Sequence, residues 1–311
     1  MARFLSILAN PTSAKATGKA DQLEQALERS GWTVNRTTRA PGEPVDRVAE
    51  RVEGSEVLVL VGGDGTVRLL ADVAAATGIP IWHHSGGNEN LFARSLGMAA
   101  TPAALEAALE QRVIHRVDRL QVGTTTSLLM VSSGFDAEIV KTVSDNRTGA
   151  VSNLNYLWPM VQVMFRWKAA RYTIDVDGER RVTDGRGWVI VANSPDYAAR
   201  FDPVPGALMD DGRLDVLFVP MRGMIGMIDW IVRCRLRLTR FRNRLLRGRN
   251  ALEFRGHEVT IQSNPGTRWQ VDGDTLADGP MSSVTVTTER AAIPVLLPAR
   301  DPASLRVLSR F

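Results

Sequence analysis

The stretch VLVLVGGDGT, residues 57–66, decides the fold of the N-terminal part of this 311-residue chain. Its first five residues form a continuous apolar run rich in β-branched side chains, which predicts a strand buried on both faces. The glycines let the backbone turn tightly, and the apolar spacing that follows, from Val67 to Ala74, predicts a helix. An ordinary glycine-rich turn is one reading of this stretch. The order of strand, GGDGT and helix favours an anion-binding loop with free N–H groups at the helix start.

The same alternation extends on both sides of this stretch. Residues 3–9 and 79–82 read as strands, and helical spacing appears at Leu23, Ala26 and Leu27. Strands alternating with helices on short connections predict an open α/β sheet over residues 1–112. We place the domain boundary near residue 120, giving an α/β domain over 1–120, and expect the tail 291–311 to pack back on it.

After about residue 113 the pattern changes to short segments with period-2 alternation, separated by Asp-Gly turns. This pattern is typical of a mainly antiparallel β domain, placed at residues 121–290. Two helical insertions interrupt it, around Tyr156–Ala170 and Gly223–Arg247. In the first of these, Met160, Val163, Met164 and Trp167 have helical spacing and predict core or pocket wall.

Composition limits the class of protein. Lys and Arg number 38 against 34 Asp and Glu, and 44% of residues are hydrophobic, as in ordinary globular proteins. The single cysteine, Cys234, predicts neither an internal disulfide nor a zinc cluster, and a reducing compartment is the simplest interpretation. Neither a transmembrane stretch nor a signal peptide is recognisable, so a cytoplasmic protein is expected.

Further motifs follow in a fixed order along the chain. They are Asn10-Pro11 with Ser13, Thr38, the GGDGT loop, the segment SGGNENLFAR at 85–94, Val117-Asp118-Arg119, Gly134-Phe135-Asp136-Ala137, Asn193, Pro205-Gly206-Ala207, DDGRLD at 210–215 and Gln270-Val271-Asp272-Gly273-Asp274. This ordered set resembles the diacylglycerol kinase catalytic-domain family, which includes bacterial lipid kinases and sphingosine kinases. The resemblance covers nearly the whole chain.

The resemblance implies an N-terminal α/β nucleotide-binding domain of the NAD kinase and diacylglycerol kinase type, followed by a mainly antiparallel β-sandwich domain. It implies phosphoryl transfer from ATP, with Mg²⁺, to the hydroxyl of a lipid alcohol, either diacylglycerol or a sphingoid or ceramide-like lipid. The nucleotide site would include Asn10, Thr38, Gly62, Gly63, Asp64, Gly65, Thr66 and Asn88. Asp64 and Asp118 would organise the catalytic Mg²⁺, and Asp274 would be the general base. A second Mg²⁺ would use Asp211 with the backbone of Leu208 and Arg213.

Four positions depart from the family pattern. Ser85 and Asn88 replace its Pro and Thr, and Leu91 stands where many members carry an acid. Asp274 is one methylene shorter than the family's Glu. These changes motivate an alternative, a catalytically weak or inactive sensor of lipid or nucleotide. A kinase for a soluble hydroxyl is a further alternative, because GGDGT also occurs in NAD kinases.

The segment Arg233–Arg249 contains eight arginines, and Trp230 precedes it. A cationic, partly apolar helix of this kind can lie at an anionic membrane surface, so peripheral attachment is expected here. The alternative is a solvated helix whose arginine stems cover apolar surface. No nucleic-acid partner is expected, since the run lacks interleaved aromatic residues. His83 and His84 are interpreted as polar lining, and Asp278-Gly279 as a turn.

Overall fold

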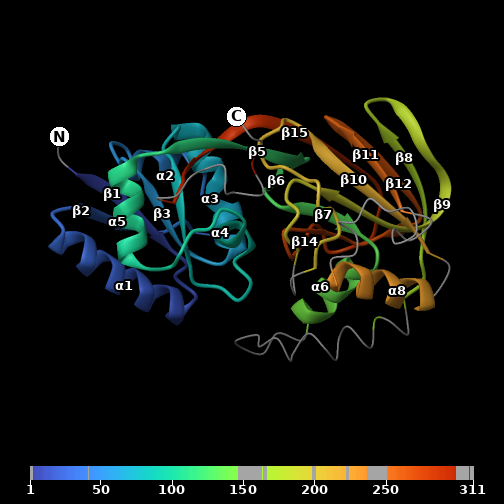
Figure 1. Cartoon of the computed structure of the whole chain (residues 1–311), viewed down its shortest axis with the longest axis horizontal. Helices are drawn as coiled ribbons and strands as arrows, with labels where there is room; N and C mark the ends of the chain where they lie inside the picture. The colour runs from blue at the N-terminus through green and yellow to red at the C-terminus, as the bar shows by residue number, and fades with distance from the viewer. Residues whose placement is uncertain are drawn as a thin grey trace. The chain divides into compact units, whose positions relative to one another are not determined.

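The computed structural model describes residues 3–40, 42–145, 163, 167–197, 201–221, 224–236, 251–298 and 308 (Figure 1). The chain divides into two compact units. Unit 1 consists of Met1–Arg119, Met209–Asp211 and Arg290–Phe311, and unit 2 consists of Leu120–Leu208 and Gly212–Glu289. Unit 1 therefore includes residues from both ends of the chain.

Unit 1 contains a parallel sheet flanked by helices. Its elements are β1 (Phe4–Ala9), α1 (Ala14–Arg29), β2 (Thr33–Thr37), α2 (Val45–Arg51), β3 (Leu58–Gly62), α3 (Asp64–Thr77), β4 (Ile81–Ser85), α4 (Leu91–Ser95) and α5 (Pro102–Gln111), followed by the start of β5 (Ile114–Val122). The strand order is β2-β1-β3-β4, and the end of β15 (Met281–Leu296) pairs with β4. All five residues of β3 are buried, which confirms the predicted central strand.

The strand order gives unit 1 a topological switch point. Parallel strands are joined by right-handed crossovers, so α1, which leads from β1 to β2, lies on one face of the sheet. The connections from β2 to β3 and from β3 to β4 run the opposite way, and α2 and α3 lie on the other face (Figure 1). The direction reverses between β1 and β3. Ligands of open α/β sheets bind at such a switch point, outside the carboxyl ends of the strands.

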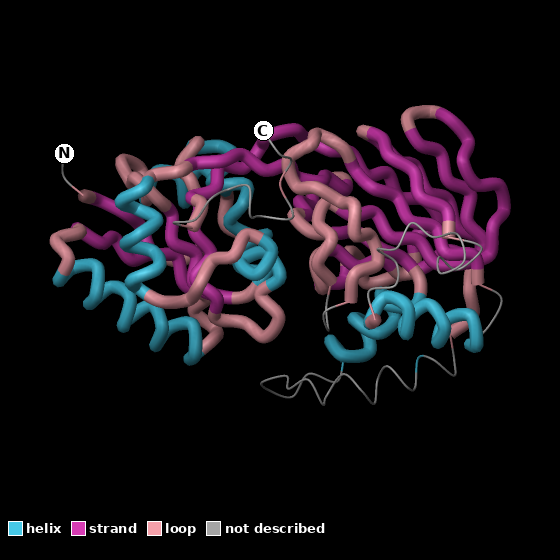
Figure 2. The backbone as a smooth tube through the Cα atoms, viewed as in Figure 1, coloured by secondary structure: helices cyan, strands magenta, loops and turns pink. Residues whose placement is uncertain are grey.

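Unit 2 is built from antiparallel strands. Besides the rest of β5 and the first part of β15, it contains β6 (Thr125–Ser127), β7 (Met130–Ser133), α6 (Phe135–Asp145), β8 (Arg171–Val176), β9 (Glu179–Ala192), β10 (Leu214–Pro220), α8 (Met224–Arg235), β11 (Leu252–Gly256), β12 (Glu258–Thr267), β13 (Trp269–Val271) and β14 (Asp274–Thr275). Figure 2 shows α6 and α8 on the same side of these strands.

The long strand β9 serves two sheets. Its first half pairs with β8, next to β12 and β15, and its second half pairs with β10 and β7, next to β11 and β13. Gly185 and Gly187 lie where β9 passes from one sheet to the other. Glycine is needed there because a Cβ at either position would lie 2.9 Å from the ring of Phe218. The apolar core lies between the two sheets and includes Val131, Tyr172, Val189, Val216, Ile261, Trp269 and Val284. This arrangement confirms the predicted β-sandwich.

The predicted helical insertions are only partly described. Helix α8 lies within the range predicted for the second insertion, whereas in the first only Val163 and residues 167–170 are described. Among the described residues, no helix combines the length and the hydropathy that crossing a bilayer requires.

Candidate active site

The glycine loop after β3 lies at the switch point of unit 1. Gly63 is the N-cap of α3, and the helix begins at Asp64, inside the GGDGT motif and before Val67, from which the apolar spacing predicted it. Gly62 carries no side chain because a Cβ there would overlap the side chain of Thr66. The 14-residue helix α3 therefore presents its N-terminal N–H groups directly beside a glycine-lined surface. Such a surface favours a phosphate group, since the helix dipole and the N–H groups act together.

A second glycine pair faces the first. The Gly86 N–H donates to the Gly62 carbonyl at 2.7 Å. A Cβ on Gly87 would lie 2.6 Å from the Cα of Gly63, and one on Gly86 would lie 3.2 Å from the Cα of Gly62. The loops after β3 and β4 thus approach each other more closely than any side chain allows.

Asp64 has a structural role that the sequence analysis did not predict. One carboxylate oxygen accepts the N–H of Leu91 at 2.9 Å and the other accepts the N–H of Phe92 at 2.9 Å. These are the first two residues of α4, so Asp64 caps this helix from a distance of 27 residues in sequence. Each oxygen retains a second lone pair, which leaves Asp64 able to face a cation or its water shell.

Asn90 shapes the second glycine loop. Its side-chain oxygen accepts the Gly87 N–H and its amide donates to the Gly87 carbonyl, both at 2.9 Å. Its φ of 48° lies in the left-handed region, which asparagine tolerates better than most residues. Asn90 fixes the loop from which the predicted phosphate ligand Asn88 projects as an exposed residue. An asparagine within a glycine-rich loop was the available sequence signal.

The loop after β1 forms the other side of the switch point. The Asn10 side-chain oxygen accepts the N–H of Thr12 at 3.0 Å and its hydroxyl at 2.8 Å. Ser13 then caps α1 by accepting the N–H of Ala16. The family resemblance implies a place for Asn10 in the nucleotide site; in the structure, its side chain also shapes this loop.

Lys19 is a basic group at this edge that the sequence analysis missed. Its ammonium group, on α1, donates to the Ser85 carbonyl at 2.6 Å, at the end of β4. Burial, followed by the charge of Lys15, lowers the pKa of Lys19. A partly desolvated cation beside a glycine-lined loop suits an anionic ligand. Its position on the helix after the Asn10 loop was the only sequence signal.

The two histidines of β4 are buried and neutral. His83 donates from Nε2 to the Gly62 carbonyl at 2.9 Å, and this bond holds the start of the glycine loop. Burial lowers the pKa of His83 despite the opposing charge of Asp64, and burial, followed by the charges of Lys19 and His83, lowers that of His84 to about 4. Both histidines are therefore uncharged at neutral pH.

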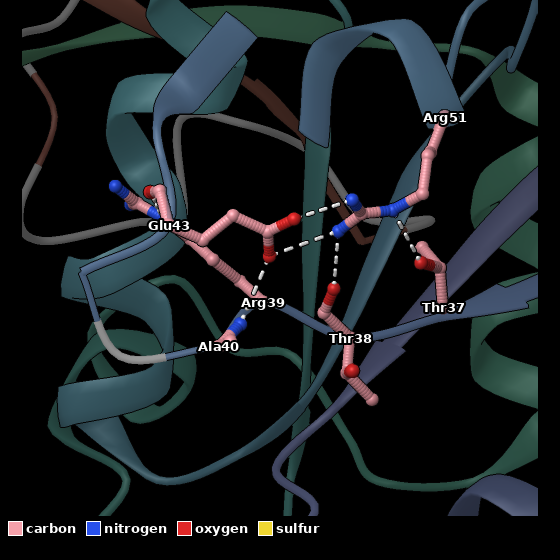
Figure 3. Close-up of polar contacts among 6 residues, drawn as sticks. All are labelled: Thr37, Thr38, Arg39, Ala40, Glu43 and Arg51. Carbon is pink, nitrogen blue, oxygen red and sulfur yellow. Dashed lines mark hydrogen bonds and ion pairs between the residues drawn. The ribbon is translucent and has the colours of Figure 1, made fainter. Parts of the chain in front are cut away.

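Thr38 lies at the end of β2, one strand farther from β3 than Asn10 (Figure 3). Its carbonyl accepts Arg51 at 2.7 Å, and Arg51 also donates to the Thr37 hydroxyl and pairs with Glu43 at 2.5 Å. The Arg51 guanidinium, followed by the Ala40 N–H, lowers the pKa of Glu43 to about 2. Figure 3 shows the Thr38 hydroxyl pointing away from this ion pair, so the cluster fixes the backbone of Thr38 and leaves its side chain outside.

Asp118, on β5, is completely buried. Its N–H donates to the Met209 carbonyl and its carboxylate accepts the Ala291 N–H, each at 2.6 Å. Asp118 therefore ties three separate segments of unit 1 together. These bonds connect Asp118 to Met209 and Ala291, whereas Asp64 binds Leu91 and Phe92.

The residues predicted for a second Mg²⁺ precede β10. Leu208 and Asp211 are half-buried, and Arg213 is exposed. Asp211 supplies the one carboxylate of this set. Throughout the described part of the chain, no three His, Cys, Asp or Glu side chains are placed to share a metal ion. A magnesium ion would therefore need carbonyl, phosphate or water oxygens in addition.

The predicted base Asp274 follows a tight turn in unit 2. Val271 pairs with Asp274, and Asp272 and Gly273 between them have φ values of 49° and 90°, as in a type I′ hairpin turn. The side chain of Asp272 binds the backbone of a neighbouring segment. It accepts the N–H groups of Leu128, Leu129 and Met130 and the hydroxyl of Ser127, at 2.8–3.0 Å. Asp274 itself is exposed.

Comparisons with known proteins agree with this architecture. Residues 5–124 match the family model of the diacylglycerol kinase catalytic domain, and residues 129–308 match that of the YegS C-terminal NAD kinase beta sandwich-like domain. A Pseudomonas fluorescens protein named "Probable lipid kinase YegS-like" is 26% identical over 269 residues, which cover 81% of this chain and 84% of the relative. A Staphylococcus carnosus protein named as a lipid kinase is 24% identical over 229 residues, which cover 73% of this chain and 72% of the relative.

Solved structures share the fold. One from Bacillus anthracis strain Sterne, described as a diacylglycerol kinase, superposes with a TM-score of 0.71 at 17% identity, covering 97% of this chain and 98% of that one. A second from the same organism has a TM-score of 0.67 at 16% identity. Together with the glycine-lined loops at the switch point, the two domain matches show that this chain is a kinase and belongs to the diacylglycerol kinase catalytic-domain family.

Proposed function

We propose that this protein is an ATP-dependent lipid kinase, which transfers the terminal phosphate of ATP to the hydroxyl of a lipid alcohol. The observation that carries the proposal is the pair of glycine loops after β3 and β4, which approach to within a distance that excludes any Cβ. They lie where open α/β sheets bind nucleotides. Relatives from two bacterial genera are named as lipid kinases.

The nucleotide phosphates would contact the backbone of Gly62–Thr66 and the N-terminus of α3. Lys19 would add a cation on one side, and Asn10, Thr38 and Asn88 would contribute polar groups from their loops. Phosphoryl transfer needs little covalent help from the protein, but it needs the phosphates held in line and their charge neutralised. Backbone N–H groups, a helix N-terminus and a partly desolvated lysine supply both.

Mg²⁺ would supply the remaining charge neutralisation. This ion takes oxygen ligands, usually one or two carboxylates together with phosphate and water. Asp64 fits that requirement because its oxygens each hold one N–H and retain a lone pair. Asp118 has no exposed surface, so its part would be to position the surrounding backbone. A second ion would rest on Asp211 with the carbonyls of Leu208 and Arg213.

Asp274 would act as the general base. Its exposed carboxylate would accept the proton of the lipid hydroxyl as the hydroxyl oxygen attacks the terminal phosphorus. The rigid turn before it keeps this carboxylate at a defined place within unit 2. Since aspartate is one methylene shorter than the glutamate of the family pattern, the base is drawn back by about 1.5 Å, a distance that affects proton transfer.

The acceptor class is a lipid alcohol, either diacylglycerol or a sphingoid or ceramide-like lipid, and access to it requires a membrane surface. The arginines of segment 233–249 are proposed to hold the protein there, although most of that segment lies outside the described residues. Within the described part of α8, Trp230 is buried, so it is not the membrane-facing residue. The exposed apolar residues are instead Ile228 and Val232 on the helix and Leu236 directly after it, which recur every four residues.

The test uses purified protein, Mg²⁺, γ-labelled ATP and mixed micelles that each carry one lipid alcohol. Asp274→Asn is compared with Asp278→Asn, a matched control because Asp278 is also exposed, belongs to a second Asp-Gly pair, Asp278-Gly279, and accepts the Arg268 guanidinium through its backbone carbonyl. We expect lipid label with the unchanged protein and the control, and a loss of at least about 100-fold in Asp274→Asn.

Three other results are informative. Equal transfer by Asp274→Asn and its control would exclude Asp274 as the base. Saturable Mg²⁺–nucleotide binding without transfer to any acceptor would favour a sensor of the same fold. Label that enters a soluble alcohol in place of a lipid would identify a kinase for soluble hydroxyls.

A further inference from the structure

Asp136, in the first turn of α6, carries a buried carboxylate that the proposed reaction does not use. One of its oxygens accepts the Trp188 indole N–H at 2.9 Å. The other accepts the Ser132 hydroxyl, the Tyr197 hydroxyl at 2.5 Å and the Gln270 amide at 3.3 Å. All these groups donate to the carboxylate, which lies at their centre.

The Gln270 side chain links this carboxylate to the turn before Asp274. Its amide nitrogen also donates to the Ser132 hydroxyl at 2.5 Å, and its amide oxygen accepts the Gly273 N–H at 2.8 Å. An amide can present only one end to each neighbour. Because Asp136 and Ser132 hold the nitrogen end, the oxygen end is directed at Gly273.

Gly273 is the second central residue of the β13–β14 turn, directly before Asp274. The other central residue, Asp272, is held by Leu128, Leu129 and Met130. The Asp272 N–H also donates to the Met130 carbonyl at 3.0 Å. The turn is therefore held through the Asp272 carboxylate, the Asp272 N–H and the Gly273 N–H. Of these, the Gly273 contact is the one that depends on the orientation of a side-chain amide.

We propose that Asp136 is a positioning residue, which orients the Gln270 amide and thereby holds the Asp272-Gly273 turn that places Asp274. The inference rests on the proposed role of Asp274 as base. Burial raises the pKa of Asp136, and the hydrogen bonds from Ser132, Tyr197, the Ala137 N–H and Gln270 oppose that effect. Burial, followed by the charge of Asp136, raises the pKa of Tyr197, so Tyr197 remains a hydroxyl donor at neutral pH.

The network allows a test by exchanging donor and acceptor. Asp136→Asn places a donor nitrogen at 136, which opposes either the Trp188 N–H or the donors on the other side, Ser132, Tyr197 and Gln270. Gln270→Glu directs a carboxylate at the Asp136 carboxylate. Either single change disrupts the hydrogen bonds that orient the side chain at 270 toward Gly273. In the double variant, the amide at 136 donates to the carboxylate at 270, and the second carboxylate oxygen again accepts the Gly273 N–H. Gln262→Glu, at an exposed position of β12, is the matched control.

Two readouts are taken on the full chain. For each single variant we expect kcat to fall about tenfold, with KM for ATP within about twofold, because the base is misplaced while the nucleotide site in unit 1 is unchanged. Hydrogen exchange of the Gly273 amide should accelerate at least about tenfold. In the double variant, kcat and the slow hydrogen exchange of Gly273 should largely return, and in the control both should equal those of the unchanged protein. If Asp136→Asn does not fold, Gln270→Met removes the Gly273 acceptor at similar volume and is measured instead.

The proposal is wrong if hydrogen exchange of the Gly273 amide is unchanged in the single variants. It is also wrong if this exchange accelerates while kcat stays the same. A third contradicting result is a double variant in which the decreases in kcat of the two single variants simply add. The two readouts also separate this inference from the proposed function. If the unchanged protein transfers no phosphate to any lipid, the proposed function fails. The exchange of Gly273 then still decides whether Asp136 holds the turn.

Discussion

Replacing Gly87 by alanine tests whether the close approach of the two glycine loops builds the nucleotide site. The added Cβ would lie 2.6 Å from the Cα of Gly63 and 3.1 Å from the side-chain oxygen of Asn90. Carbon atoms in contact prefer about 3.5–4.0 Å, so the loops must separate by about 1 Å. Overpacking of this kind costs about 1–3 kcal/mol of folding free energy.

The same separation would disturb the N–H donation from Gly86 to Gly62 and the surface that faces the phosphates. We therefore expect Gly87→Ala to weaken Mg²⁺–ATP binding about tenfold or more, which corresponds to about 1.4 kcal/mol. Isothermal titration calorimetry measures the binding, and denaturant unfolding measures the stability.

Gly18→Ala is the matched control. Gly18 lies within α1, and a Cβ there would have no neighbour within 4 Å. Alanine in a helix is more favourable than glycine by about 0.5–1 kcal/mol, so this variant should be slightly more stable and bind nucleotide normally. Wild-type affinity and stability in Gly87→Ala would refute the argument that the contact between the loops forms the site.

Two further predictions concern buried polar groups. Asp272→Ala removes the acceptor of three N–H groups in the buried segment 128–130. We therefore expect the free energy of unfolding, measured with denaturant, to fall by about 3 kcal/mol or more. A decrease below about 1 kcal/mol would contradict this account. The folded-state pKa of His84, about 4, lies below its unfolded value near 6.5, so its contribution to stability is present above pH 6.5 and is lost as the pH falls toward 4. Between pH 7.5 and 4.5 the unfolding free energy should fall by about 2–3 kcal/mol more in the unchanged protein than in His84→Gln, and equal losses would show that His84 is not the titrating group.

Much of the fold was predictable because its signals are local. The apolar run before Gly62 identified the central strand, and the Asp-Gly pairs and period-2 segments identified the antiparallel domain. These patterns reflect contacts between residues that are two to four positions apart, and any sequence window contains them. The ordered motifs also identified the glycine loop and the turn before Asp274 as candidate site segments.

The roles of individual side chains were not predictable in the same way. Asp64 caps a helix 27 residues away, Lys19 reaches a carbonyl 66 residues away, and Asp272 binds N–H groups up to 144 residues away. The sequence of a motif does not distinguish a carboxylate that faces a cation from one that accepts a backbone N–H. Trp230 likewise looked suited to a membrane surface, but it is buried within unit 2, to which it belongs.

The sequence by itself determined the alternation of strands and helices in the N-terminal part, the change to period-2 segments after about residue 113, and the family pattern. Only the tertiary structure decided which polar groups of the motifs hold the backbone and which remain directed outward. The physical reason is that hydrogen bonds between distant segments depend on how strands are ordered in the sheets. That order follows from packing over the whole chain and leaves no periodic trace in the sequence.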